Sequence, residues 1–76
     1  MAAFVNFVGF PSGARIFVDD AEIGEVPLYN YMMKWGSYQM RFQKEGYEPE
    51  ERIDFRIFKT DHKKTVVVQL KKKREF

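Results

Sequence analysis

The stretch PSGARIFVDDAEIGEVPL, residues 11–28, decides the fold of this chain. It opens with the turn formers Pro11-Ser12-Gly13, because proline donates no backbone hydrogen bond and glycine can adopt a positive φ. From Ala14 to Val18 every second residue is apolar, a two-residue period that predicts a strand with one buried face. Asp19-Asp20-Ala21-Glu22 then predicts a hairpin-like connection, and Pro27 closes the unit. The stretch therefore predicts short strands joined by turns, and it carries no catalytic signature.

The rest of the chain continues this design. Strands are expected over residues 4–10, 14–19, 22–25, 28–33, 38–43, 52–57 and 66–70, with 22–25 as a short charged edge and a helical turn as the weaker alternative at 28–33. Turns are expected at residues 34–36 and 44–47, and a hairpin loop at 60–63. No stretch has a convincing helical period. The sequence thus predicts an all-β fold, a small antiparallel β-sandwich of about six to seven short strands.

Alternation along these strands also predicts a core. It comprises Val5, Phe7, Ile16, Val18, Tyr38, Met40, Phe42, Ile53, Phe55, Ile57, Val66, Val68 and Leu70. In the strand that contains Ile53, the same alternation assigns Arg52, Asp54 and Arg56 to the solvent side. The opposite faces still carry apolar side chains, namely Phe4, Phe10, Phe17, Tyr29, Tyr31, Phe58 and Val67. A small sandwich has little room for this surplus, so we expect part of it to form an exposed patch of the kind that marks protein interfaces.

Length and charge limit the possible classes of protein. With 76 residues and no cysteine, the chain is long enough for one small domain with a thin core and no disulfide framework. We expect this domain over residues 1–70 and a frayed basic tail over 71–76. Residues 1–58 carry six Lys/Arg against nine Asp/Glu, a net −3, whereas residues 59–76 carry seven against two, a net +5. This asymmetry is a better indication of partners than the formal net charge of +2.

The first residues, Met1-Ala2-Ala3-Phe4, lack the basic and apolar regions of a signal peptide, and no apolar run approaches the roughly 20 residues of a membrane span. We therefore expect no membrane span, and a location in the cytoplasm or in an assembled particle.

The tetrapeptide Pro11-Ser12-Gly13-Ala14 resembles the Pro-Glu-Gly-Ala motif of the PEGA domain, a short all-β module. The resemblance extends over roughly residues 3–70, through residues 15–19, the Ile-Gly-x-x-Pro-Leu element at 23–28, the strand 36–42, the Lys-Glu-Gly-Tyr turn at 44–47 and the closing strand 66–70. Two residues depart from the family pattern, since Asp20 replaces glycine and Val26 replaces threonine. We expect the Asp19-Asp20 turn to be looser as a result.

This resemblance implies a sandwich of the transthyretin or prealbumin kind, often appended to surface-layer, envelope or regulatory proteins, and it does not imply an enzyme. It also implies that Tyr47, which follows the turn glycine Gly46, packs back onto the sheet. No ligand-binding residues follow from it, because a fold by itself does not assign a function.

No constellation of residues predicts catalysis, a metal or a cofactor. His62 is the only histidine and lies in a polar stretch between Asp61 and Lys63, where a solvated loop residue is the simplest interpretation. Ser12 and Ser37 lack a histidine partner in their context. The acidic residues Asp19, Asp20, Glu22 and Glu25 do not follow the ordered pattern of a calcium loop, so a polar turn beside a charged edge is the preferred interpretation.

The basic run Lys71, Lys72, Lys73 and Arg74, with Lys63 and Lys64 across the preceding turn, is the strongest electrostatic feature. It predicts either attraction to an acidic surface or simply a solvated tail that keeps the protein soluble. Nucleic acid is an unlikely partner, because the first 58 residues are net acidic.

The candidate interaction residues are the outward aromatics Phe10, Phe17, Tyr29, Tyr31, Trp35 and Phe58. Trp35, before Gly36 at a turn, is either a lid on the core or an interface anchor. The leading hypothesis is a non-enzymatic structural or protein-interaction module that binds another protein or copies of itself, for example as a decoration or assembly component of a virus particle or a surface structure. The alternative is a module that binds carbohydrate or a cell-envelope polymer through Tyr29, Tyr31 and Trp35, and weak nucleic-acid or anionic-surface binding through the basic end ranks third.

Overall fold

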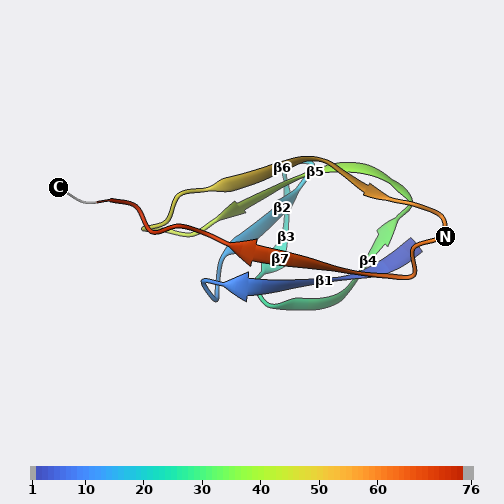
Figure 1. Cartoon of the computed structure of the whole chain (residues 1–76), viewed down its shortest axis with the longest axis horizontal. Helices are drawn as coiled ribbons and strands as arrows, with labels where there is room; N and C mark the ends of the chain where they lie inside the picture. Colours follow the sequence, from blue (N-terminus) through green and yellow to red (C-terminus); the bar gives the residue numbers. More distant parts are fainter. Residues whose placement is uncertain (1, 75–76) are drawn as a thin grey trace.

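The computed structural model describes residues 2–74, apart from the side chain of Ile53. Within this range the chain forms seven strands and no helix, which confirms the all-β prediction (Figure 1). The strands are β1 (Ala2–Phe10), β2 (Arg15–Val18), β3 (Ala21–Glu25), β4 (Leu28–Lys34), β5 (Gly36–Gln43), β6 (Glu50–Ile57) and β7 (Lys63–Gln69).

The strands form two sheets that pack as a sandwich, as predicted. The three-stranded sheet has the order β4-β1-β7, and the four-stranded sheet has the order β3-β2-β5-β6. The domain is elongated, with extents of 48 × 20 × 17 Å. Strands β1 and β7 point along the long axis in the same direction, so residues 71–74 follow at the end opposite to the start of β1 (Figure 1).

Two predicted connections differ from the structure. Residues 60–63 do not close a hairpin, because β6 and β7 belong to different sheets and the chain crosses the sandwich between them. The sheets are also not wholly antiparallel, since β1 and β7 pair in parallel from Phe4↔Lys63 to Phe10↔Gln69. The chain visits the other sheet between these strands, so both can enter the three-stranded sheet from the same end.

The Asp19-Asp20 turn is tight rather than loose. Val18 pairs directly with Ala21, which leaves a two-residue hairpin loop with φ values of 48° for Asp19 and 68° for Asp20. Positive φ at both central residues suits the right-handed twist of a hairpin, and aspartate tolerates this region better than most residues. The Asp19 carboxylate also accepts a hydrogen bond from the Gln39 backbone N–H, at 2.8 Å. The loop is thereby anchored to β5.

A bulge in β6 overturns the predicted orientation of Arg52. Asp54 has a φ of 68°, and the register shifts so that Arg52 lies opposite the buried Met40. Its guanidinium lies 5.5 Å from the ring centroid of Phe42, and it donates a hydrogen bond to the carbonyl of Val67 on β7. Alternation could not predict this, because one inserted residue reverses the side on which every earlier residue of the strand lies.

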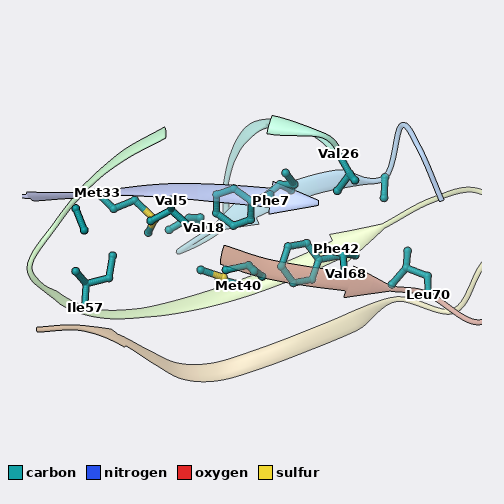
Figure 2. Packing of buried hydrophobic residues seen from close by; sticks show 14 residues of the cluster. Val5, Phe7, Val18, Val26, Met33, Met40, Phe42, Ile57, Val68 and Leu70 are labelled. Carbon is teal, nitrogen blue, oxygen red and sulfur yellow. The ribbon is translucent and has the colours of Figure 1, made fainter. Parts of the chain in front are cut away.

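The core lies between the two sheets (Figure 2). The predicted core residues other than Tyr38, Ile53 and Phe55 are buried, and they are joined by Ala3, Ala14, Val26 and Met33. Tyr38 and Phe55 are half-buried against this cluster, and the side chain of Ile53 lies outside the described part. Tyr47 also packs on the core, as the family resemblance implied, with its ring 5.9 Å from that of Phe10.

The beginning of the predicted tail is part of the fold. Lys71 accepts a backbone hydrogen bond from Glu48, Lys73 donates one to Gly46, and Lys72 forms a bridge with Tyr47. Residues 71–73 are therefore paired with the turn that precedes β6 instead of frayed, because this turn offers free backbone groups at the end of the sheet. The predicted tail residues 75–76 lie outside the described part.

Candidate interaction surface

The outer face of the three-stranded sheet presents two groups of apolar side chains, Phe4 with Met32 at one end and Val8, Val67 and Phe10 toward the other, with the Asn6–Thr65 pair between them. The register places Phe4 beside Met32 and Lys63, Val8 beside Val67, and Phe10 beside Gln69. Phe4 is 47% exposed, Phe10 54%, Met32 65% and Val67 57%. We call Phe4, Val8, Phe10, Met32 and Val67 the apolar face. Large hydrophobic side chains gathered on one sheet face, and not scattered singly, are typical of an interaction surface.

Basic residues lie around the apolar face. Lys63 flanks Phe4, Lys34 pairs with Ala2 at the same end, and Lys71 follows Gln69 at the other end. Strands β1, β4 and β7 contain no Asp or Glu, whereas the five acidic residues found within strands all belong to β3 and β6 of the four-stranded sheet. The acidic residues of the strands therefore all lie in the four-stranded sheet. Dividing the sequence at residue 58 does not reveal this separation.

On the outer face of the four-stranded sheet, the aromatic and charged side chains contact one another. The ring of Phe17 lies between two guanidinium groups, 5.1 Å from that of Arg15 and 4.7 Å from that of Arg41. Arg15 forms a bidentate pair with Glu22, with both N–O distances at 2.9 Å. This hydrogen-bonded pair lowers the pKa of Glu22 and raises the pKa of Arg15. The cation–π contacts and ion pairs thus involve most of the charged groups on this face, although the buried Nε–H of Arg41 has no hydrogen-bond partner among the described residues.

The strand edges offer poor sites for adding another strand. At β4 a bulge with Asn30 at φ 55° interrupts the pairing, and β3 is short and acidic with its own register shift. At the other edges, β6 and β7 are joined by side-chain hydrogen bonds. Lys64 of β7 donates to the backbone carbonyl of Arg56 on β6, at 2.9 Å, and Arg52 of β6 donates to the backbone carbonyl of Val67 on β7. Bulges and charges of this kind protect edges from pairing. The apolar face is thus the more accessible surface for docking.

The candidate residues from the sequence divide into three groups in the structure. Phe10 belongs to the apolar face, and Tyr29 is exposed beside the Asn30 bulge. Phe17 and Tyr31 are half-buried, and the ring of Tyr31 turns toward the core with its centroid 6.4 Å from that of Phe7. Tyr31 and Phe17 therefore have structural contacts of their own.

Trp35 and Phe58 lie at the crossings between the sheets and are exposed. A cavity of about 200 Å³ is lined by Ala2, Trp35, Lys59, Asp61 and His62. The structure does not bring Tyr29, Tyr31 and Trp35 onto one platform, because Tyr31 points inward on β4 and Trp35 lines this terminal cavity. The three aromatics proposed for carbohydrate stacking thus face different surroundings.

Sequence reasoning missed Met32 altogether and counted Phe4 and Val67 only among the surplus. Strict alternation from Tyr29 and Tyr31 would place Met32 on the side opposite to them, but the bulge at Asn30 turns Tyr31 inward and leaves Met32 outward beside Phe4. The lone asparagine within an apolar run was the available signal, since asparagine is among the residues that adopt positive φ most readily.

The basic residues of the second half do not gather in one place. The extended chain separates Lys63 from Lys71 by roughly 26 Å, given a rise of about 3.3 Å per residue. Lys64 also pairs with Asp61, at 3.6 Å, and lies over the ring of Phe55. The cluster predicted from sequence is thus divided between the two ends of the molecule.

Three of the four acidic residues of the 19–25 segment contact basic or backbone groups: Asp20 lies 3.4 Å from Arg41, Glu22 pairs with Arg15, and Asp19 accepts a hydrogen bond from the backbone of β5. Among residues 2–74, no three His, Cys, Asp or Glu residues gather in a way that could hold a metal ion. Over the same residues, no helix has the length and apolarity needed to cross a membrane.

Comparison with known proteins gives one positive result. No curated protein and no solved structure matches the chain significantly. The PEGA domain family matches residues 9–74, which include all seven strands except the first part of β1. The chain belongs to the PEGA domain family.

Proposed function

We propose that this protein is a non-enzymatic interaction module that holds a partner protein on the apolar face of its three-stranded sheet. The observation that carries the proposal is the exposure of Phe4, Phe10, Met32 and Val67 on one sheet face. Burial of apolar surface contributes about 25 cal/mol per Å², and interface energy concentrates in a few central anchors. Phe4 and Phe10 are suitable anchors, since aromatic side chains bury much area for few rotatable bonds.

Such a module would serve as a structural or assembly component of a larger particle or surface structure, in which a small domain decorates a repeated partner. The elongated shape, 48 Å in its longest dimension, and the distance between the two basic ends support contact along the length of the molecule.

Site-specific photo-crosslinking in the natural host tests the proposal. A benzophenone amino acid replaces Val67 on the apolar face, and a matched control replaces Gln39 on the outer side of β5, which is also exposed. We expect discrete crosslinked protein products from the Val67 position and much weaker ones from the Gln39 position. Equal crosslinking from both faces, or none from Val67, would contradict the proposal.

Light scattering after size exclusion, at about 50 and 500 mM salt, separates a foreign partner from self-association. A monomer at both concentrations excludes a second copy as the partner. An oligomer that survives high salt and is lost in Val67→Lys indicates that the partner is a second copy.

A further inference from the structure

We infer that the partner of the apolar face is a protein surface with an apolar centre and a rim of carboxylates, and that it is not the same face of a second copy. This inference rests on the proposed function and adds the chemistry of the partner. It follows from where the charged residues lie around the apolar face. The fold sets these positions, and the order of the residues in the sequence does not show them.

The first step concerns the lysines at the rim. Lys34, Lys63 and Lys71 are exposed, and none of them takes part in an ion pair within residues 2–74, where the ion pairs use Arg15, Arg41, Arg52, Arg56 and Lys64. The lysines that flank the apolar face are therefore free to pair with carboxylates brought by a partner. Complementary charge around an apolar centre speeds association and selects the partner.

The second step concerns self-association. If two copies met through this face with their strands side by side, parallel or antiparallel, lysines at the ends of one copy would lie near lysines of the other, because β1, β4 and β7 offer no carboxylate. Like charges facing each other across an interface are unfavourable. A different protein with surface carboxylates avoids this repulsion, because its carboxylates can pair with the lysines at the rim.

The third step separates a protein from other anionic partners. Phe4 and Phe10 are six residues apart on β1, roughly 20 Å along the strand; Met32 lies beside Phe4, Val8 and Val67 lie toward Phe10, and the Asn6–Thr65 pair lies between these groups. Successive bases of a single strand stack on aromatic side chains along a groove. Two aromatics this far apart, with aliphatic and polar side chains between them, suit the mixed side chains of a protein partner.

A selection experiment with the full chain tests the inference. The immobilised protein selects from a phage-displayed library of random peptides of about 15 residues, long enough as a helix to span the roughly 20 Å of the face. Selected peptides are then synthesised and their affinities measured by fluorescence anisotropy for four variants, each checked by circular dichroism for an unchanged fold. A thymidine oligonucleotide and phosphatidylserine vesicles serve as anionic probes of other classes.

The variants separate the inference from the proposed function. We expect peptides rich in Asp, Glu and apolar residues, bound roughly tenfold more weakly by Lys34→Glu/Lys63→Glu. Lys44→Glu/Lys73→Glu changes the net charge equally at a cavity lined by Arg15 and Gln43 of the four-stranded sheet and is expected to have a much smaller effect. Phe4→Ser/Val67→Ser is expected to abolish binding, while Gln39→Ser/Ser37→Ala on the other sheet is expected to preserve it.

Each other outcome has a definite meaning. Apolar peptides without acidic residues, unaffected by Lys34→Glu/Lys63→Glu, would overturn the acidic partner and leave the proposed function in place. Absence of any peptide that prefers the wild type over Phe4→Ser/Val67→Ser would overturn both. Tighter binding of the oligonucleotide or of the vesicles than of any peptide, lost in Lys34→Glu/Lys63→Glu, would replace the protein partner by nucleic acid or lipid.

Discussion

The two outer faces of the sandwich carry aromatic residues in opposite states. On the four-stranded sheet, Phe17 is covered by Arg15 and Arg41, and these cations pair with Glu22 and Asp20. On the three-stranded sheet, Phe4 and Phe10 are open and their flanking lysines have no ion-pair partner within residues 2–74. Outward aromatics are therefore not equivalent: Phe17 has cation contacts within its own sheet, whereas Phe4 and Phe10 are exposed.

The largest expected effect concerns the close approach of β1 and β7 at Gly9 and Val68. A Cβ at Gly9 would lie 1.8 Å from the carbonyl oxygen of Val68, and its φ of 137° is unfavourable for other residues. Because a backbone atom cannot move aside cheaply, we expect Gly9→Ala to lower the free energy of unfolding by about 3 kcal/mol or more. Urea denaturation measures this loss.

Gly46→Ala is the matched control, since Gly46 also has positive φ, 84°, but nothing lies within 4 Å of its added Cβ. We expect it to cost only about 1 kcal/mol. If both substitutions cost the same, the close approach of β1 and β7 would not be the reason for glycine at position 9.

The second prediction compares the two faces directly. Phe17→Ala removes a half-buried ring and its two cation contacts, so we expect a loss of about 1–2 kcal/mol in the free energy of unfolding. Val67→Thr on the apolar face keeps the β-branched shape and is expected to change stability by less than about 0.5 kcal/mol.

Chemical denaturation of both variants decides this comparison. A larger loss for Val67→Thr than for Phe17→Ala would mean that the open face is structural, and it would weaken the case for a docking surface.

The third prediction concerns Asp20, whose backbone forms the two-residue turn and whose carboxylate pairs with Arg41 on the outer face of the four-stranded sheet. The φ of Asp20, 68°, is a conformation that glycine adopts more readily than other residues. Its exposed carboxylate lies 3.4 Å from the Arg41 guanidinium, which is a long distance for a hydrogen bond. Exposed pairs of this kind contribute little. We therefore expect Asp20→Gly to raise the free energy of unfolding by roughly 0.5–1 kcal/mol, measured by thermal or urea unfolding. A net loss of stability would show that the pair outweighs the turn strain.

The smallest effect is a titration. The hydrogen bond from Arg15 lowers the pKa of Glu22, and that from Arg56 lowers the pKa of Asp54. Because both pKa values are depressed, these pairs stabilise the fold above the pKa of the unfolded carboxyl groups, and the contribution disappears as the pH falls through the folded values. Carboxyl NMR should give a Glu22 midpoint below that of an ordinary glutamate, and Arg15→Gln should return it toward the ordinary value. An unchanged midpoint in Arg15→Gln would exclude the pair as the cause.

The extent of sequence prediction can be judged from individual elements. The turns at Pro11-Ser12-Gly13 and Lys44–Tyr47 were predictable because proline and glycine act locally, and the strands with regular alternation gave a correct core through Ile16, Met40 and Phe42. The orientation of Arg52 was not predictable, because it depends on the bulge at Asp54, which is set by pairing with another strand. For Met32 the lone Asn30 was a signal, but its pairing with β1, which fixes the bulge, was not visible in the sequence.

By itself, the sequence determined the all-β class, the family and most of the core, since two-residue alternation and turn formers are properties of neighbouring residues. Only the tertiary structure decided which outward side chains are free. It brought Arg15 and Arg41 over Phe17, and it set β1, β4 and β7 side by side so that Phe4 lies beside Met32 and Val8 beside Val67, with flanking lysines that form no ion pair within residues 2–74. The physical reason is that exposure and charge pairing depend on contacts between distant strands, which no local pattern records.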